Sequence, residues 1–596
     1  MTTTTAATDA GQPFSLAMNR VRRAYAAVAE VDRPEIWIAL RPEADVLREA
    51  SLLDERSAAG ERLPLAGRLL AVKDNIDVVG LPTTAGCPAY SYLPTQSAPA
   101  VSRLVRAGAL VLGKANLDQF ATGLVGTRSP YGAVRNAWRP ERISGGSSSG
   151  SAVAVALGLV DLGIGTDTAG SGRIPAALQG IVGIKPTPGL IPTTGVVPAA
   201  PSYDCVSVFA RTIGAAEEAV GIMAGPDAVD PRCTARPPDA PLAAGTEPLL
   251  AVPDPARLPG LDPAWVEAFA AACRRATDVG MRVVTIDLSA FLEAAALLYD
   301  GALVAERYSA VGAFIDTHPD SIDPTVRQIV QSAGTLSAHQ LVSDRHRVAT
   351  LRQAAMLALG EADALLVPTA PEHPTLEAVA EDPRGVNTRL GRYTNFANLF
   401  GLTAVAVPAG TVDDGPFGVT VLARGFADRV ACDIARQLAD PMHCGAPVPE
   451  PGGEPLLVIG AHLRGQPLHH ELTALGARFD RAVQTAPHYR LFALSTRPAK
   501  PGMTYVGPDS DGVSVSGELF RIPTASLGVL LSHLPPPMTL GPVRLDDGYT
   551  VTGFLCQLVA AEQPRDISDV GSWSHYLRQA ALPWHGAHRR APPRRS

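Results

Sequence analysis

The chain has 596 residues, of which 46% are hydrophobic and 18% are charged, and this ordinary globular usage excludes a wholly disordered or fibrous protein. At about 150 residues per domain, this length predicts two to four domains. The net charge of −7 comes without a basic face or stripe, which argues against nucleic acid as the main partner.

The seven cysteines are scattered and include no CxxC pair, which argues against a disulfide framework or a structural zinc site. The N-terminus lacks a basic start followed by an apolar run, and no stretch reaches the roughly 18 apolar residues that a membrane span needs. These features predict a soluble protein of the cytoplasm, with no membrane partner.

Short apolar runs alternate with helical stretches through residues 1–440, which we predict to form the larger domain. The runs LLAVKDN (69–75) and ALLVPTA (364–370) are typical of buried strands, and PAVSRLVRAGA (99–109) is typical of a helix. This alternation predicts the α/β class, with a mixed β-sheet core covered by helices.

Lysine is rare in this chain. Of the 51 lysines and arginines, only Lys73, Lys114, Lys185 and Lys500 are lysines. Arginine cannot lose its proton at accessible pH whereas a buried lysine can, so the need for a chemical base is one reason to retain a lysine. Chance retention at the surface is the alternative for any one of them.

Residues 144–151 read SGGSSSGS, and they are followed by the apolar run AVAVALGLV and by DLGIGTDTAGSGRIP. A flexible linker is a poor explanation, because linkers are not normally embedded between apolar runs. A phosphate loop would need GK[ST], and Gly163 and Gly165 fail as a dinucleotide fingerprint because Thr168 stands where the third glycine belongs. Nucleotide binding therefore has little support.

Lys73 in AVKDNIDV, the GGSSSG block and GTDTAGSGRIP together resemble the defining elements of the amidase signature family. The separations also match, with 74 residues from Lys73 to Ser147 and 24 from Ser147 to Ser171. The resemblance implies the amidase signature fold and a Ser-cisSer-Lys triad, in which Ser171 is the nucleophile and Ser147 the relay. It implies a cis peptide bond between Gly146 and Ser147. We expect neither a metal ion nor a cofactor.

Each residue of this triad has a physical role. A serine hydroxyl is a weak nucleophile until a base takes its proton, and a lysine serves only where its pKa falls from about 10.4 towards neutrality. Lys73 is therefore expected to be buried and neutral. The turn TAGS is expected to direct backbone N–H groups at the substrate carbonyl oxygen, with Thr168, Ala169 and Gly170 forming the oxyanion hole.

Other charged residues near these motifs are interpreted as structural. Asp167 and Arg173 flank the nucleophile, and an ion pair that holds the loop is favoured over a catalytic role for either. Lys114 and Lys185 resemble other fixed points of the family fold, so neither is the expected base.

The segment FLEAAALLYDGALVAERYSAVGAF (291–314) is predicted to be a helix, in which Tyr299 and Arg307 lie about 80° apart around the axis. They could address one pocket; an exposed arginine and a core tyrosine are the alternative. This segment, NLDQFATGLVGTRSPYG (116–132) and the C-terminal region resemble the allophanate hydrolase family. The resemblance implies that Tyr299 and Arg307 hold the substrate carboxylate, which suits a forked guanidinium, and that Gly123 borders the amide end.

The same resemblance implies hydrolysis of allophanate, through an acyl-enzyme on Ser171, to ammonia and N-carboxycarbamate and then to carbon dioxide. It places the chain in urea or cyanuric acid degradation, with pathway enzymes that supply allophanate, and implies a homo-oligomer such as a homodimer. The alternatives are an ammonia-supplying subunit of a glutamyl-tRNA amidotransferase, an amidase for another small amide, and an inactive scaffold that binds a pathway enzyme through residues 456–575.

The Pro- and Gly-rich segment 441–455 is predicted to be a linker to a second domain at residues 456–580. The β-rich runs of this domain predict a small, barrel-like α+β fold; they are LLVIGAHL, HYRLFALS, GVSVSGELFRIP and YTVTGFLCQL. Residues 581–596 are predicted to be a disordered basic tail.

The second domain resembles the γ-glutamylcyclotransferase-like fold found at the C-terminus of allophanate hydrolases. Where cyclotransferases show Tyr-Gly-Ser-Leu, residues 460–463 read Gly-Ala-His-Leu, which argues against cyclotransferase activity. Assistance with decarboxylation is the implied alternative. His462 is the candidate residue, since imidazole titrates near neutrality; His469, His470 and Glu518 have weaker claims.

Overall fold

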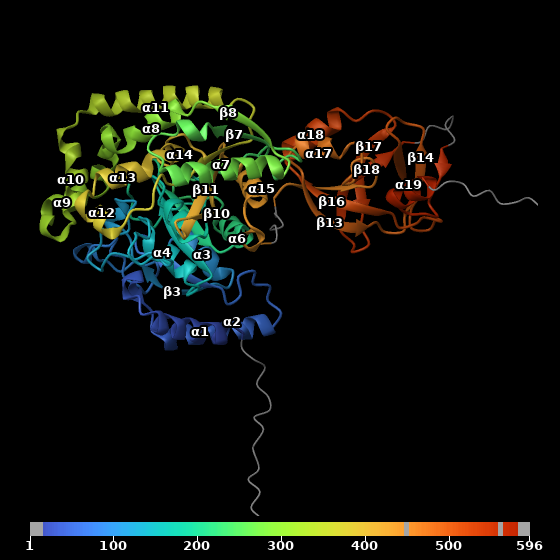
Figure 1. The fold of residues 1–596 in the computed structure, drawn as a ribbon. Coiled ribbons are helices and arrows are strands. Elements are labelled where there is room, and N and C mark those ends of the chain that lie inside the picture. Colours follow the sequence, from blue (N-terminus) through green and yellow to red (C-terminus); the bar gives the residue numbers. More distant parts are fainter. Residues whose placement is uncertain (1–15, 446–451, 558–563, 582–596) are drawn as a thin grey trace, which may run out of the picture. The chain divides into compact units, whose positions relative to one another are not determined.

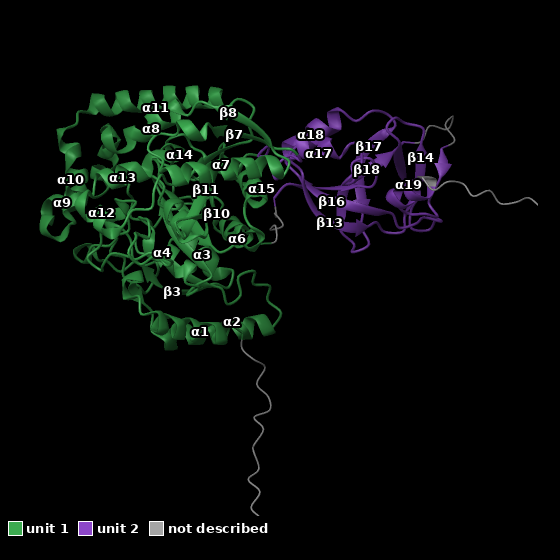
Figure 2. Ribbon diagram, viewed as in Figure 1, with its two compact units in different colours: residues 1–237, 247–448 green, residues 238–246, 449–596 purple. Residues whose placement is uncertain are grey.

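The computed structural model describes residues 16–445, 452–557 and 564–581, which form two compact units (Figure 2). Unit 1 comprises residues 1–237 and 247–448, and unit 2 comprises residues 238–246 and 449–596. The second division falls inside the predicted linker, in which Pro441–Cys444 (α16) is helical. The predicted basic tail, apart from its first residue, lies outside the described residues.

Residues 238–246 belong to unit 2, although they lie within the range predicted for the first domain. Their hydrogen bonds explain the difference. The Leu242 N–H donates to Gly476 O, and Leu242 O accepts from Arg478 Nη1 at 3.1 Å. Pro238 O accepts from the Ala525 N–H. Backbone pairing with residues more than 200 positions away leaves no signal in a local sequence pattern.

Unit 1 is built on a large mixed β-sheet (Figure 1). Its strands are β1 (Trp37–Leu40), β2 (Leu69–Lys73), β3 (Leu110–Ala115), β4 (Leu162–Asp167), β5 (Val182–Lys185), β6 (Cys205–Ala210), β7 (Leu249–Pro253), β8 (Arg282–Ile286), β9 (Ala364–Pro368), β10 (Thr403–Val412) and β11 (Gly415–Ala423). Among the described residues the sheet has 11 strands in the order β1-β3-β2-β4-β6-β5-β10-β11-β9-β7-β8.

The pairing within this sheet explains its sequence pattern. β2 pairs in parallel with both β3 and β4, whereas β4 pairs antiparallel with β6. Every residue of β2, β4 and β9 is buried. Strands buried on both faces read as continuous apolar runs, which is the pattern of LLAVK and ALLVP. The predicted mixed sheet covered by helices is confirmed.

Helices cover the sheet, with α1 and α2 packed together beside β3 and with α8 packed against α11 (Figure 1). The helices of unit 1 besides α16 are α1 (Leu16–Val31), α2 (Glu43–Ala58), α3 (Pro99–Arg106), α4 (Ser149–Ala156), α5 (Ile174–Gln179), α6 (Ile213–Met223), α7 (Pro263–Asp278), α8 (Ser289–Asp300), α9 (Ala305–Thr317), α10 (Pro324–Gln331), α11 (Ala338–Leu359), α12 (Leu376–Glu381), α13 (Gly385–Leu390), α14 (Phe396–Leu399) and α15 (Asp428–Leu438). In the described part of the chain, none of the helices has the length and apolar character needed to cross a membrane.

Helix α4 explains the serine-glycine block. Ser149 to Val155 are all buried, and a Cβ atom built at Gly150 would lie 2.3 Å from Ile36 O. Only a helix of small residues can approach the neighbouring backbone this closely. The block is therefore part of the core of unit 1, and it places the residues that precede α4 deep inside the unit.

Segment 291–314 was predicted to be one helix, and this prediction is wrong. The helix α8 ends at Asp300 and α9 begins at Ala305. Gly301 between them is extended, with φ −101° and ψ −178°, and the next N–H, that of Ala302, donates to Asp344 Oδ2. Glycine weakens a helix interior, and an acceptor on another helix takes over a backbone donor here.

Unit 2 contains two sheets and three helices among its described residues. The strands are β12 (Glu454–Val458), β13 (Arg478–Gln484), β14 (Tyr489–Leu494), β15 (Lys500–Tyr505), β16 (Ser516–Ile522), β17 (Met538–Arg544), β18 (Thr550–Cys556) and β19 (Arg565–Asp566). The sheet orders are β13-β16-β12-β18-β17 and β15-β14-β19. The helices are α17 (His469–Ala474), α18 (Thr524–Ser532) and α19 (Trp573–Ala581). Leu457, Phe520 and Trp573 lie in the core, and the predicted smaller α+β domain is confirmed.

Candidate active site

Lys73 is the last residue of β2, and its side chain is completely buried. Its Nζ lies 2.8 Å from Ser147 Oγ and 2.7 Å from Thr166 Oγ1 on β4. Burial lowers the pKa of Lys73 from its ordinary 10.5 to about 7, although the charges of Asp118 and Asp204 oppose this shift. The lysine that the sequence singled out is therefore buried, and its pKa lies near neutrality, as a base requires.

Two serine side chains extend the hydrogen-bonded chain that begins at Lys73. Ser147 lies just before α4, and Ser171 lies in the loop between β4 and α5. Their Oγ atoms are 3.0 Å apart, so hydrogen-bond distances connect Lys73 Nζ to Ser171 Oγ through Ser147. The peptide bond between Gly146 and Ser147 is cis, as predicted. The three predicted triad residues are thus brought together.

Asp118 organises the loop that follows β3. Its carboxylate accepts hydrogen bonds from the backbone N–H groups of Val125, Gly126 and Arg128 at 3.0–3.2 Å. Glycines pack directly on this carboxylate, because a Cβ atom would lie 2.6 Å from Asp118 Oδ2 if built at Gly123 and 2.2 Å if built at residue 146. The packing explains why Gly123 is a glycine, and its contact with substrate stays a prediction.

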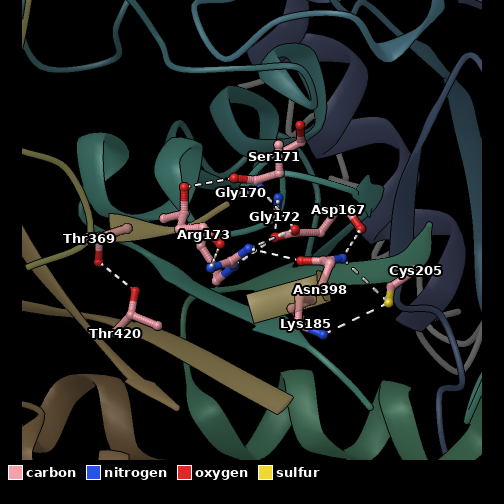
Figure 3. Close-up of polar contacts among 12 residues, drawn as sticks. Asp167, Gly170, Ser171, Gly172, Arg173, Lys185, Cys205, Thr369, Asn398 and Thr420 are labelled. Carbon is pink, nitrogen blue, oxygen red and sulfur yellow. Dashed lines mark hydrogen bonds and ion pairs between the residues drawn. The ribbon is translucent and has the colours of Figure 1, made fainter. Parts of the chain in front are cut away.

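A buried ion pair supports the loop that carries Ser171 (Figure 3). Arg173 Nε and Nη2 each lie 2.9 Å from a different carboxylate oxygen of Asp167, and both side chains are completely buried. Burial opposes ionisation of Asp167, but Arg173 and further hydrogen bonds outweigh it and lower the pKa of the carboxyl group. The Ser171 side chain points away from this pair. The arrangement fits the predicted structural role.

A segment far along the chain fastens the same loop. The Thr394 hydroxyl donates to Ala169 O at 2.7 Å, and Thr394 O accepts from Arg173 Nη1 at 3.0 Å. Asn398 on α14 donates to Asp167 O at 2.7 Å and accepts from Arg173 Nη2 at 3.2 Å (Figure 3). Contacts from residues 394–398 therefore fix both the peptide groups and the ion pair beside Ser171.

The predicted oxyanion donors differ in their availability. The Gly170 N–H donates to Asp167 Oδ1 at 3.0 Å, so a carboxylate already occupies it. Within the described residues, the N–H groups of Ala169 and Ser171 have no hydrogen-bond partner. The oxyanion role of Thr168, Ala169 and Gly170 stays a prediction. Because its N–H already donates to Asp167, Gly170 is a weaker candidate for this role than Thr168 and Ala169.

Tyr299 and Arg307 meet, although they lie on different helices. Arg307 is only 1% exposed, which excludes the exposed arginine considered as the alternative. Its Nη2 lies 3.0 Å from the Tyr299 hydroxyl and its Nη1 lies 3.1 Å from Thr122 Oγ1. The guanidinium carbon is 4.9 Å from the centroid of the Tyr299 ring. These direct partners are uncharged, so a carboxylate that binds here would meet a buried cation.

The other buried lysines of unit 1 are occupied elsewhere. Lys114 Nζ lies 3.0 Å from Asp74 Oδ1 in a completely buried ion pair. Lys185 Nζ donates to Pro186 O at 2.9 Å and lies 3.8 Å from Cys205 Sγ (Figure 3). Within the described residues, neither lysine forms a hydrogen bond to Ser147 or Ser171, which agrees with their interpretation as parts of the fold.

The family model described as Amidase matches residues 20–432. This chain belongs to the amidase family. The model described as Allophanate hydrolase C-terminal domain matches residues 454–578. The amidase match thus spans the Lys73–Ser147–Ser171 arrangement, and the second match begins where β12 begins.

Individual relatives extend the comparison. Urea amidolyase of Saccharomyces cerevisiae is 39% identical over 580 residues, which cover 92% of this chain and 31% of that protein. The chain therefore spans about a third of the length of this relative. A glutamyl-tRNA(Gln) amidotransferase subunit of Symbiobacterium thermophilum is 36% identical over 69% of this chain and 91% of its own.

Among solved structures, the selenomethionine-substituted allophanate hydrolase of Kluyveromyces lactis superposes with a TM-score of 0.84 and 37% identity. The match covers 95% of this amidase-family chain and 97% of that protein. The similarity therefore extends beyond the amidase region into the second unit.

In unit 2, His462 lies in a pocket that the sequence alone could not place. The pocket is also lined by Gly460, Lys500 and Phe554, among others. The His462 ring stacks on Phe554 at 4.9 Å between centroids, and its Nε2 lies 2.9 Å from Glu471 Oε2. Burial lowers the pKa of His462 below its ordinary value.

The weaker candidates of unit 2 have local partners. Glu518 Oε1 accepts from Arg464 Nε at 2.9 Å. His469 Nδ1 lies 3.2 Å from His462 O, and His470 Nδ1 lies 2.9 Å from Pro467 O. In the described part of the chain, no group of three or more His, Cys, Asp or Glu side chains is arranged to hold a metal ion.

Sequence reasoning missed five residues that shape the site. Three of them lie inside NLDQFATGLVGTRSPYG or GTDTAGSGRIP, so the proximity of Asp118, Thr122 and Thr166 to the triad could have been suspected. Thr122 lies in the same loop as Asp118. Nothing local connects Thr394 and Asn398 with a loop more than 220 residues upstream.

Proposed function

We propose that this chain hydrolyses allophanate, the carboxylated form of urea, and releases ammonia. The observation that carries the proposal is the Arg307 guanidinium, which is buried in the same unit as the Lys73–Ser147–Ser171 arrangement and is hydrogen-bonded to the neutral hydroxyls of Tyr299 and Thr122. A buried cation with neutral partners favours an anionic ligand. The solved relative named allophanate hydrolase supports the same substrate.

The first chemical step uses the three predicted catalytic residues. Neutral Lys73 takes a proton from Ser147, and Ser147 in turn takes the proton of Ser171. At the same time, Ser171 Oγ attacks the terminal carbamoyl carbon of the substrate. The N–H groups of Thr168 and Ala169 stabilise the negative oxygen of the tetrahedral intermediate. The proton returns through Ser147 to the leaving nitrogen, and ammonia departs.

The second step releases the product. The acyl group that remains on Ser171 is a carbamoyl group that still carries the substrate carboxylate. Water loses a proton to the same Lys73 relay and attacks this acyl-enzyme, which restores Ser171 and yields N-carboxycarbamate. Arg307 and Tyr299 hold the carboxylate through both steps, and Gly123 leaves room at the amide end.

Unit 2 is assigned to the decarboxylation that follows. N-carboxycarbamate takes up a proton at nitrogen, loses carbon dioxide and becomes carbamate, which hydrolyses to ammonia and bicarbonate. The pocket of His462 contains Lys500, whose positive charge suits the carboxylates, and His462 forms part of the wall that holds this anionic intermediate, while water supplies the proton. His462→Ala is expected to slow carbon dioxide release without slowing release of the first ammonia, measured in parallel on one reaction.

Ammonia release by the purified chain tests the main proposal. Allophanate is compared with malonamide, acetamide, glutamine and urea, and Ser171→Ala is the control. Spontaneous decarboxylation of allophanate gives urea, so ammonia reports the enzyme. We expect strong preference for allophanate that disappears in the variant. Activity on other amides alone would refute the allophanate assignment and leave the amidase chemistry standing.

The glutamine arm of this assay tests the second candidate, an ammonia-supplying amidotransferase subunit, which the 36% identity to such a subunit favours. In line with the family resemblance, we assign the reaction to urea or cyanuric acid degradation and place it in the cytoplasm. We also propose that the chain forms a homo-oligomer such as a homodimer. Light scattering on the purified chain measures the oligomeric state.

A further inference from the structure

A second buried guanidinium lies beside the Arg307 site. Arg128 is 2% exposed; its Nη1 donates to Thr122 O at 2.9 Å and its Nη2 to Pro383 O at 2.6 Å. Its buried Nε has no hydrogen-bond partner among the described residues. Thr122 therefore joins two cations, because its carbonyl accepts from Arg128 and its hydroxyl from Arg307.

The surroundings of Arg128 differ from those of Arg173. Arg173 forms a two-pronged ion pair with Asp167, whereas the guanidinium of Arg128 donates to two carbonyl groups and only its backbone N–H donates to a carboxylate, that of Asp118. A buried charge is costly unless a group of opposite charge compensates it. A purely structural role for Arg128 would need only its hydrogen bonds. Its charge and its unpartnered Nε point instead to an anion.

Arg128 lines a depression on unit 1. The lining includes Tyr299, whose hydroxyl bonds to Arg307, and Asn387 on α13. It also includes Arg384 and Asp300, both exposed. The depression thus presents two positive charges and one negative charge next to the tyrosine of the proposed carboxylate site.

Building on the proposed function, we propose that this depression is an anion-binding antechamber. Arg128 and Arg384 attract the carboxylate of a small amide before it reaches Arg307. Both charges raise the local concentration of an anionic substrate, and Asp300 opposes them. The antechamber therefore contributes selectivity for carboxylate-bearing amides over neutral ones.

Matched substrates separate this role from a structural one. The value of kcat/KM is measured for malonamate, which carries a carboxylate, and for malonamide, its neutral counterpart, at about 20 mM and about 300 mM salt. Arg128→Gln and Arg384→Gln are each expected to lower kcat/KM for malonamate about threefold to tenfold at low salt, and for malonamide less than about twofold. Asp300→Asn is expected to raise kcat/KM for malonamate. High salt is expected to reduce the effects of the substitutions at the two exposed positions, Arg384 and Asp300.

Two controls accompany these variants. Arg128→Lys keeps the charge and is expected to retain more of the preference for malonamate than Arg128→Gln. Arg389→Gln removes an arginine of α13 whose partners are Glu372 and Asp382, and it is expected to leave the substrate ratio unchanged.

Equal losses for both substrates, or no loss for malonamate, would overturn the antechamber. The proposed function fails separately: a wild-type chain that is inactive on allophanate, but whose variants still distinguish malonamate from malonamide, would refute the allophanate assignment alone.

Discussion

Activity is expected to depend on pH through Lys73, because only the neutral amine can act as the base. With a pKa of about 7, about half of the molecules carry neutral Lys73 at pH 7. With the ordinary pKa of 10.5, roughly one molecule in 3,000 would do so. Burial therefore increases the active fraction at pH 7 by more than about 1,000-fold.

The dependence of kcat/KM on pH measures this pKa in the free enzyme. Ammonia release from malonamide or allophanate is followed between pH 5.5 and 9.5, where kcat/KM is expected to fall about tenfold for each pH unit below 7 and to level off near pH 8. Lys73→Arg, which cannot lose its proton, is expected to be inactive. A profile that is flat, or that still rises tenfold per unit at pH 9, would refute the reasoning.

The same pKa has a consequence for stability. The folded pKa is below the unfolded one, so between about pH 7 and 10.5 the unfolded chain binds more protons and stability rises with pH. The whole shift corresponds to about 5 kcal/mol, at about 1.4 kcal/mol for each tenfold change. Relative to Lys73→Met, the wild type is expected to gain about 3 kcal/mol in free energy of unfolding from pH 6 to pH 9. Guanidinium chloride unfolding of both proteins at the two pH values measures this difference.

Three further substitutions test the site. Arg173→Met leaves Asp167 buried without its partner, so denaturant unfolding is expected to show a loss of about 3–5 kcal/mol; an unchanged midpoint would contradict the pairing. Gly170→Ala places a Cβ atom 2.4 Å from Thr394 Oγ1 at a φ of +134°, and steady-state assays should show at least a tenfold loss of kcat, with wild-type kcat as the contrary result. Arg307→Gln removes the cation for the carboxylate and is expected to raise the KM for allophanate at least tenfold while that for malonamide changes little; equal changes for both would argue against the assignment.

The sequence predicted the catalytic candidates of the site better than the residues that hold them in place. Lys73, Ser147 and Ser171 belong to motifs whose spacing carries information, and the structure brings their side chains together. Thr394 and Asn398 were not predicted, because they reach the loop of Ser171 through tertiary contacts that leave no local pattern. The mixed sheet was predictable for a different reason, since doubly buried strands must be apolar along their whole length.

The single helix predicted over 291–314 was wrong, yet the proximity of Tyr299 and Arg307 that it suggested was right. The sequence placed Tyr299 and Arg307 on one helix, about 80° apart. The chain instead breaks at Gly301 and restarts as α9, and the two side chains meet across the break at 3.0 Å. Periodicity could not reveal the break, because the apolar spacing continues through Gly301 while the acceptor for Ala302, Asp344, comes from α11.

Charge compensation separates the two halves of the site. Beside the loop of Ser171, the charges of Asp167 and Arg173 compensate each other within the protein, so this part of the site needs no charged ligand. Around Thr122, Arg128 and Arg307 instead bond to carbonyls and hydroxyls. A protein that leaves such cations to neutral partners keeps part of their electrostatic energy for a ligand. We infer that the free energy of binding an anion comes mainly from the two arginines that contact Thr122. The loop of Ser171, with its paired Asp167 and Arg173, holds the geometry of the attack.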